Sequence, residues 1–278
     1  MLLKSRKWSD LSTRDFARMQ QSEGREQVVA VLPVAATEQH GPHLPLSVDV
    51  TLLEGIMGAT LPLLPEDLPV LFLPIQTVGK SNEHAAFPGT LTFSTETVLR
   101  AWCELGAGVA AAGVRKLLLF NTHGGHVSVM DLVARDLRER HDLLVFACSW
   151  FNLPLGEAAL QRFSAQEHRF GIHAGDIETS MMLALRPDLV DMRLARDFRS
   201  ASEDRTTRYP ILGNGVSAKM GWHIQDYHAQ GAVGNAAAAT AEKGQVLLDA
   251  AAQALANLLA EISALPLATS LGRADPLG

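Results

Sequence analysis

The feature of this sequence that most constrains its fold is a regular alternation of short apolar runs with amphipathic segments. The apolar runs are too short for helices of average length, and they cover 28–36, 70–75, 116–121 and 143–150. Helical patterns fill the gaps between them, over 48–61, 94–113 and 127–141. Because strands that are apolar along their whole length must be covered on both faces, we expect an α/β fold with a mainly parallel sheet and right-handed crossovers.

The second half of the chain continues this pattern with one interruption. Helices are predicted over 174–191, up to the Arg186-Pro187 break, and over the alanine-rich stretch 236–262. The segment 197–235 between them has little periodicity and many Gly, Ser and polar residues, which is typical of a lid or a subunit contact. We expect residues 1–278 to form a single domain, since α/β domains of this length need not split.

Composition and charge exclude several classes of partner. The 24 Lys and Arg against 30 Asp and Glu give a formal charge of -6, and no basic cluster is longer than the scattered face of Arg135, Arg138 and Arg140, so nucleic acid is not expected to bind. No run approaches the roughly 18 uninterrupted apolar residues of a spanning helix, so no membrane association is expected. The first residues lack the apolar region of a secretion signal, which favours a cytoplasmic location.

Cysteine usage restricts the metal sites that the chain could build. Cys103 and Cys148 are the only two cysteines, and each lies in an apolar neighbourhood. They indicate two buried thiols rather than a disulfide framework or a thiolate zinc site. Any metal must therefore be held by histidines and carboxylates.

Such groups follow the first predicted strand, in TEQHGPHLPLSVD at 37–49. Glu38 and His40 are separated by one residue, so in extended backbone their side chains leave the same side of the chain. The prolines and the glycine that follow stiffen a loop that can return Asp49 to the same point. Ligands in open parallel sheets bind beyond the carboxyl ends of the strands, and this loop is placed there.

Two further stretches carry the same types of group. NTHGGH, at 121–126, follows the third strand and supplies His123, while HAGDIETS places His173 before a helix and Glu178 in its first turn. Carboxylate with imidazole and no thiolate is the ligand mixture of hydrolytic Zn²⁺, Mn²⁺ or Fe²⁺ sites, and two such ions about 3.5 Å apart could share an Asp. The alternative is that each residue is an ordinary hydrogen-bonded or solvated group.

Taken together, these motifs resemble the creatininase (creatinine amidohydrolase) family. The matching pieces are LPVAATEQHGPHLPLSVD (32–49), NEHAAFPGTLTF (82–93), LLLFNTHGGH (117–126) and HAGDIETSMMLALRPDLV (173–190). The resemblance implies a three-layer α/β/α sandwich and a homo-oligomer, commonly a hexamer. It also implies a two-metal centre, most simply with Zn²⁺ or Mn²⁺, whose ligands are Glu38, His40, Asp49 as the bridge, His123 and Glu178. His173 resembles the family's catalytic proton shuttle.

The sequence departs from creatininase itself at two places. The family pattern has Tyr-Glu after the metal-binding His of the third strand, with the Glu helping to hold a metal, but this chain has Gly124-Gly125. One ion or two could therefore bind. Where creatininase carries a tryptophan and an Asp before the shuttle His, this chain has Arg169 and Phe170, which argues against creatinine as the substrate. The Gly-Gly form is similar to formamide deformylases and to a mycofactocin maturation enzyme of the wider family.

Three other residues have two interpretations each. His84 could contact substrate at the mouth of the site or be a loop histidine bonded to backbone. Trp150 could line the pocket or belong to the core. His126 could hydrogen-bond a metal ligand or cap the helix that starts at Val127.

These observations support one main hypothesis and two alternatives. The main one is a metal-dependent amidohydrolase that uses a metal-bound hydroxide on a non-peptide or cyclic amide C–N bond, with Glu178 orienting the nucleophile and His173 protonating the departing nitrogen. Within the family, a formamide deformylase or a peptidase-like maturation enzyme is the alternative. From another class, THGGH before a helix could mark a phosphate-binding or nucleotide-binding protein without hydrolase activity.

Overall fold

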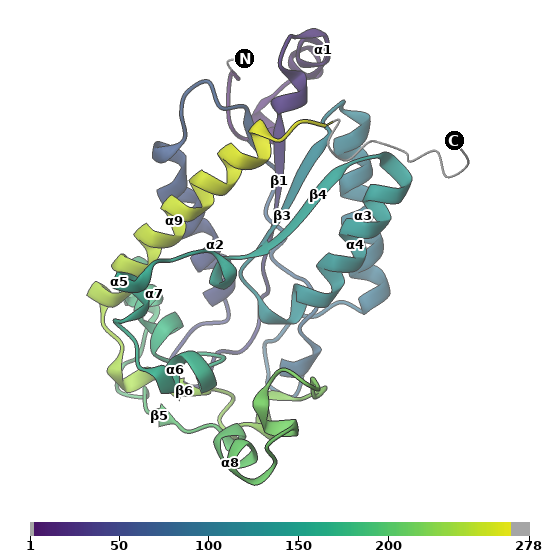
Figure 1. Cartoon of the computed structure of the whole chain (residues 1–278). Helices are drawn as coiled ribbons and strands as arrows, with labels where there is room; N and C mark the ends of the chain where they lie inside the picture. Colours follow the sequence, from purple (N-terminus) through teal and green to yellow (C-terminus); the bar gives the residue numbers. More distant parts are fainter. Residues whose placement is uncertain (1–2, 268–278) are drawn as a thin grey trace.

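The computed structural model describes residues 3–267, and its centre is a four-stranded parallel sheet (Figure 1). The strand order is β2-β1-β3-β4, and the strands are β1 (Val29–Val34), β2 (Val70–Phe72), β3 (Lys116–Asn121) and β4 (Leu144–Ser149). Val29 lies opposite Val70 on one side and Lys116 on the other. Every pairing in this sheet is parallel, so the predicted fold class is confirmed.

Helices cover both faces of the sheet and make three layers. On one face lie α2 (Val48–Thr60), α7 (Asp176–Leu185) and α9 (Ala241–Ala264), and on the other α3 (Thr95–Ala111) and α4 (Val127–His141) (Figure 1). Successive strand residues supply the two cores in turn: Val29 and Val31 pack with the α2, α7 and α9 side, while Ala30 and Leu32 pack with α3 and α4. The uninterrupted apolar strands therefore follow from burial on both faces.

Helix α9 is long and apolar enough to cross a membrane by length and composition, with a mean hydropathy of 1.3 over its best window. More than half of that window is buried inside the protein, where the helix packs against α2 and α7. At its end, buried Lys116 donates a hydrogen bond of 2.6 Å from Nζ to the carbonyl oxygen of Ser263. Its apolar side therefore serves the core of the α/β sandwich.

Several short elements were not predicted from the sequence. They are α1 (Thr13–Gln21), α5 (Glu157–Leu160), α6 (Ala165–Phe170), α8 (Ala201–Arg208) and the antiparallel pair β5 (Asp197–Phe198) and β6 (Gly234–Asn235). Helix α8 corrects the expectation that 197–235 has no regular element, because Ser200 caps a helix with acidic residues in its first turn and arginines in its last. The predicted helix over 236–262 begins only at Ala241, since Thr240 is its N-cap.

The carboxyl ends of the strands all face one end of the molecule. In Figure 1 this end also holds α6, β5, β6 and α8, so the segment 197–235 gathers where the predicted site residues emerge from the sheet. Parallel topology thus brings loops that are distant in sequence to one edge.

Candidate metal centre

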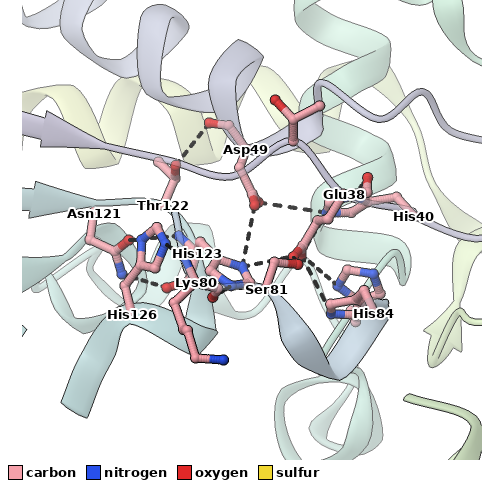
Figure 2. Close-up of polar contacts among 12 residues, drawn as sticks. Glu38, His40, Asp49, Lys80, Ser81, His84, Asn121, Thr122, His123 and His126 are labelled. Carbon is pink, nitrogen blue, oxygen red and sulfur yellow. Dashed lines mark hydrogen bonds and ion pairs between the residues drawn. The ribbon is translucent and has the colours of Figure 1, made fainter. Parts of the chain in front are cut away.

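The predicted ligand residues form one buried polar cluster at the carboxyl end of the sheet (Figure 2). Glu38 and His40 lie in the loop after β1, Asp49 in the first turn of α2, His123 directly after β3, and Glu178 in the first turn of α7. Glu38, His40 and Asp49 are each 1% exposed and His123 is 3% exposed, whereas the Glu178 side chain is 17% exposed. Charged groups so deeply buried require partners.

Asp49 occupies the middle of this cluster. Its Oδ1 lies 3.6 Å from His40 Nε2, and its Oδ2 lies 3.4 Å from His123 Nδ1 (Figure 2). Glu38 Oε1 is 3.1 Å from His123 Nδ1, and Glu178 Oε2 is 3.9 Å from His40 Nε2. One carboxylate therefore faces two histidines, each of which has a second carboxylate beside it.

Three buried atoms of the cluster have no hydrogen-bond partner among residues 3–267: Glu38 Oε1, His40 Nε2 and Asp49 Oδ2. Ligand atoms of the same three residues lie within 4.8 Å of one another. Leaving buried polar groups unpaired costs about 1–3 kcal/mol each, and more for charged groups. A divalent cation would satisfy all three, so the residues present fit a metal site.

Hydrogen bonds on the far side of each ring aim the histidines at the cluster. His40 donates from Nδ1 to the backbone oxygen of Glu38 at 3.0 Å, and His123 donates from Nε2 to the backbone oxygen of Lys80 at 2.9 Å. In the neutral rings the remaining nitrogens, Nε2 of His40 and Nδ1 of His123, are therefore free of hydrogen. Metal-binding histidines are oriented in this way.

The carboxylates set the electrostatics of the cluster. Burial alone would lower the pKa of His40, but Asp49, Glu178 and Glu38 overcome it and raise that pKa to about 9. The pKa of His123 is likewise raised well above its ordinary value against the effect of burial, by Glu38 and Asp49. Burial raises the pKa of Glu178 to about 7. The site favours positive charge, supplied by protons in the metal-free protein.

Gln39 fixes the hydrogen position on His84. Its amide is oriented by two backbone groups, since Nε2 donates to the Gly231 oxygen at 2.8 Å and Oε1 accepts from the Gly41 N–H at 3.0 Å. The same Nε2 lies 2.7 Å from His84 Nδ1, which must then accept. Neutral His84 therefore carries its hydrogen on Nε2, which faces Glu38 Oε1 at 3.5 Å.

His173 has the opposite arrangement. Its Nε2 donates to the backbone oxygen of Gln39 at 2.8 Å, so its bare Nδ1 faces Glu38 Oε1 at 3.8 Å. The ring centroids of His84 and His173 are 4.2 Å apart. Burial, followed by the charge of neighbouring His40, lowers the pKa of His173 well below its ordinary value, and burial also lowers the pKa of His84. One neutral histidine thus presents an acceptor and the other a donor to the same space.

The structure also decides between the interpretations of His126 and Trp150. His126 stands at the N-cap position of α4, as one interpretation has it, but its side chain makes no capping hydrogen bond. It donates from Nδ1 to Asn121 Oδ1, which also accepts from the His123 N–H, and its Nε2 accepts from the Lys80 N–H at 3.0 Å. Its ring also meets the His123 ring edge-on, with centroids 4.5 Å apart. Trp150 is 4% exposed and belongs to the core that packs against α9, which supports the core interpretation over a pocket wall.

Four residues of the site were missed as functional groups. Gln39 lies between two predicted ligands, Ser81 donates from Oγ to Glu38 Oε2, and Glu83 lies next to His84 in the sequence. Asn121 ends β3 and was counted as part of the strand. Their common signal is a polar residue at the end of an apolar strand or beside a predicted ligand. His84 itself lies in the cluster, 1% exposed, and within the described part of the chain its ring contacts the Gln39 side chain rather than a backbone group.

The segment 197–235 reaches this site through Trp222. The Trp222 ring meets the His84 ring edge-on, with centroids 6.2 Å apart. This contact places part of the segment beside the cluster.

Comparison with known proteins agrees with the motifs. The family model described as creatinine amidohydrolase matches residues 9–259. The mycofactocin precursor peptide peptidase of Mycobacterium tuberculosis (strain CDC 1551 / Oshkosh) is 35% identical over 173 residues, 60% of this chain and 61% of that protein. The creatinine amidohydrolase of Pseudomonas putida is 30% identical over 246 residues, 84% of this chain and 89% of that protein.

Solved structures give the same result for the fold. A manganese form of creatininase superposes with a TM-score of 0.74 at 26% identity, covering 94% of this chain and all of that one. A mutant creatininase of Zn-Zn type has a TM-score of 0.72 at 26% identity, with 94% and 100% covered. With a family model that matches nearly the whole chain, a shared fold and the predicted residues gathered in one cluster, the chain belongs to the creatininase (creatinine amidohydrolase) family of hydrolases.

Proposed function

We propose that this family member is a metal-dependent amidohydrolase that cleaves a non-peptide or cyclic amide C–N bond. The observation that carries the proposal is the set of three orphaned buried atoms on Glu38, His40 and Asp49, which converge on one point together with His123 and Glu178. Buried carboxylates of this kind repel an anion, so the phosphate-binding alternative is set aside.

The ligand set divides into two groups that share Asp49. Glu38 and His123 lie on the side of Asp49 Oδ2, while His40 and Glu178 lie on the side of Oδ1. We therefore expect two divalent ions per chain, Zn²⁺ or Mn²⁺, with Fe²⁺ or a single ion as alternatives. When bound, such ions lower the pKa of coordinated water to near 7 and polarise an amide carbonyl.

The protein's own groups then move the protons. His173 Nδ1, which is bare in the neutral ring, can accept the proton that the nucleophile loses and return it to the departing nitrogen. His84 Nε2–H points into the same space and can donate a hydrogen bond to the carbonyl oxygen as negative charge develops there. Gln39 keeps these two roles apart, because it contacts both rings.

A peptide amide is the second candidate substrate. The specific observation in its favour is the 35% identity with a mycofactocin precursor peptide peptidase, of which this chain spans 61%. A formamide remains the third, by the Gly-Gly form of the motif at Gly124 and Gly125. Arg169 and Phe170 in place of the creatinine-holding pair argue against creatinine.

The first experiment measures metal content. Purified protein should contain close to two divalent ions per chain by mass spectrometry, and Asp49→Asn should lose them together with any hydrolytic activity. Asp67→Asn is the matched control, because Asp67 is exposed in a loop before β2. Absence of bound metal after incubation with Zn²⁺ and Mn²⁺ would refute the proposal.

A second experiment separates the substrate classes. The metal-loaded protein is offered a lactam, a formamide and a short peptide, and the ring-opened amino acid, formate or new peptide ends are measured. Cleavage of the peptide alone would replace the main proposal by the peptidase, while turnover of none by a fully loaded protein would count against an amidohydrolase.

Assembly and location belong to the same proposal. We expect a homo-oligomeric cytoplasmic enzyme with a single domain, in which 197–235 acts as a lid or a subunit contact. Light scattering on the purified protein, with and without an excess of Zn²⁺ over the two expected ions, tests the assembly. A monomer at all protein concentrations would contradict it.

A further inference from the structure

Glu83 lies behind the predicted metal ligand His123, on the side of the ring that faces away from the cluster. Its Oε1 is 3.3 Å from His123 Nε2, the nitrogen that also contacts the Lys80 oxygen at 2.9 Å. The opposite nitrogen, Nδ1, faces Glu38 and Asp49. The ring therefore connects a buried carboxylate, whose residue is 8% exposed, to the place where a cation is expected.

Gly125 leaves the space that this carboxylate occupies. A Cβ at position 125 would overlap Glu83 Oε1 and His123 Nε2, and it would lie 2.9 Å from the Lys80 oxygen. Gly125 has no positive φ, so its backbone does not require glycine. Neighbouring Gly124 has nothing within 4 Å of its own Cβ position. The second glycine of the pair is thus required for space, and the first is not.

From this arrangement we infer that Glu83 is a positioning residue for metal binding. Its carboxylate, in the space left by Gly125, lies beside the His123 Nε2–H that donates to the Lys80 oxygen, and so helps to hold Nδ1 toward Glu38 and Asp49. The inference rests on the proposed metal site. A carboxylate behind a histidine ligand fixes the ring and makes the ligating nitrogen more basic. No side chain at position 125 is needed to supply negative charge beside His123, because Glu83 brings it from another loop.

The experiment measures Zn²⁺ affinity directly, by competition with a chromophoric chelator. Glu83→Ala should raise the dissociation constant for Zn²⁺ about 10-fold to 100-fold. Glu83→Gln keeps an acceptor oxygen without the charge, so it should give a smaller increase and act as the conservative rescue. Glu66→Gln, at an exposed loop position, is the control and should bind as the wild type does.

Substitutions at the two glycines give an independent test. Gly125→Ala should weaken Zn²⁺ binding, since its methyl group displaces Glu83 or His123, whereas Gly124→Ala should leave the affinity within about twofold, as for surface changes without contacts. Far-ultraviolet circular dichroism of each metal-free variant verifies that it is folded.

The outcomes separate this inference from the proposed function. If Glu83→Gln and Glu83→Ala both fold and bind Zn²⁺ with the affinity of the wild type, the role of Glu83 is overturned and the proposed metal site is not. A wild-type protein that binds no Zn²⁺ would overturn both. If Glu83→Ala does not fold, the near-isosteric Glu83→Gln decides, and unchanged affinity there would also overturn the inference.

Discussion

Raising the pH from 7 to 9 should destabilise the metal-free protein. The carboxylates around His40 outweigh its burial and raise its pKa to about 9 in the folded state, while in the unfolded chain the value is near 6.5. A raised pKa contributes stability that is complete below the unfolded value and is lost as the pH rises through the folded one. For His40 alone the loss between pH 7 and pH 9 is about 2 kcal/mol.

Other groups of the cluster either act in the same direction or are silent in this range. The raised pKa of His123 adds to the loss. His84 and His173 have lowered pKa values, so both are neutral in the folded and the unfolded chain above pH 7. Asp49, whose pKa is lowered by His123 and His40 against the effect of burial, stays ionised in both states.

Metal should reverse this dependence. Binding requires bare nitrogens on His40 and His123, so Zn²⁺ competes with protons below the raised pKa values. Its apparent affinity should rise with pH by up to about tenfold per pH unit for each proton displaced, and the stability of the loaded protein should rise accordingly.

Urea unfolding followed by circular dichroism tests the pH dependence of stability both without and with Zn²⁺. The free energy of unfolding is measured at pH 7, 8 and 9 with a chelator, and again at a fixed free Zn²⁺ concentration set by a metal buffer. The variant His40→Ala is the control and should lose its share of the pH dependence. A metal-free protein whose stability is constant or rises over this range would refute the electrostatic account of the cluster.

Two further predictions concern the helix pair α3 and α4 and the Gln39 network. Gly106→Ala would push a methyl group into the buried Leu137 side chain and should lower the free energy of unfolding by about 1–3 kcal/mol. Gly108 faces open space on the same helix, so Gly108→Ala should raise the free energy of unfolding by up to about 1 kcal/mol. Thermal unfolding compares the two variants. Gln39→Leu removes the hydrogen bond to His84 Nδ1 and should reduce the rate of hydrolysis by up to about 100-fold, with the metal content unchanged. Loss of metal in this variant would show instead that Gln39 holds the metal ligands in place.

The sequence predicted the sheet well because β1, β2 and β3 are buried along their whole length and the half-buried edge strand β4 still has an apolar run. The runs 116–121 and 127–141 coincide with β3 and α4, since a fully apolar strand and an amphipathic helix leave clear patterns. Helix α8 was missed because it has no buried residue, so its stability depends on Ser200 as a cap and on charge placement rather than on an apolar stripe.

The predicted metal ligands could be identified from the sequence, but the residues that orient them could not. Glu38, His40 and Asp49 stand out by type in an apolar stretch, and parallel topology explains their meeting with His123. Gln39 and Glu83 act through contacts made only in three dimensions. No periodicity marks Gly125 as a residue that leaves room for another loop.

The wide separation along the chain of the cluster's contributors has a consequence for folding kinetics. Gln39 and His173 are 134 residues apart, and their contact requires that β1 has paired in the sheet and that α7 has docked. Glu38, His40 and Asp49 are local in sequence, but His123 and Glu178 join them only when loops of this length close, so we expect the complete ligand set to form after the main folding barrier. Zinc should then leave the refolding rate unchanged and slow unfolding, which makes the loaded enzyme long-lived rather than quick to form.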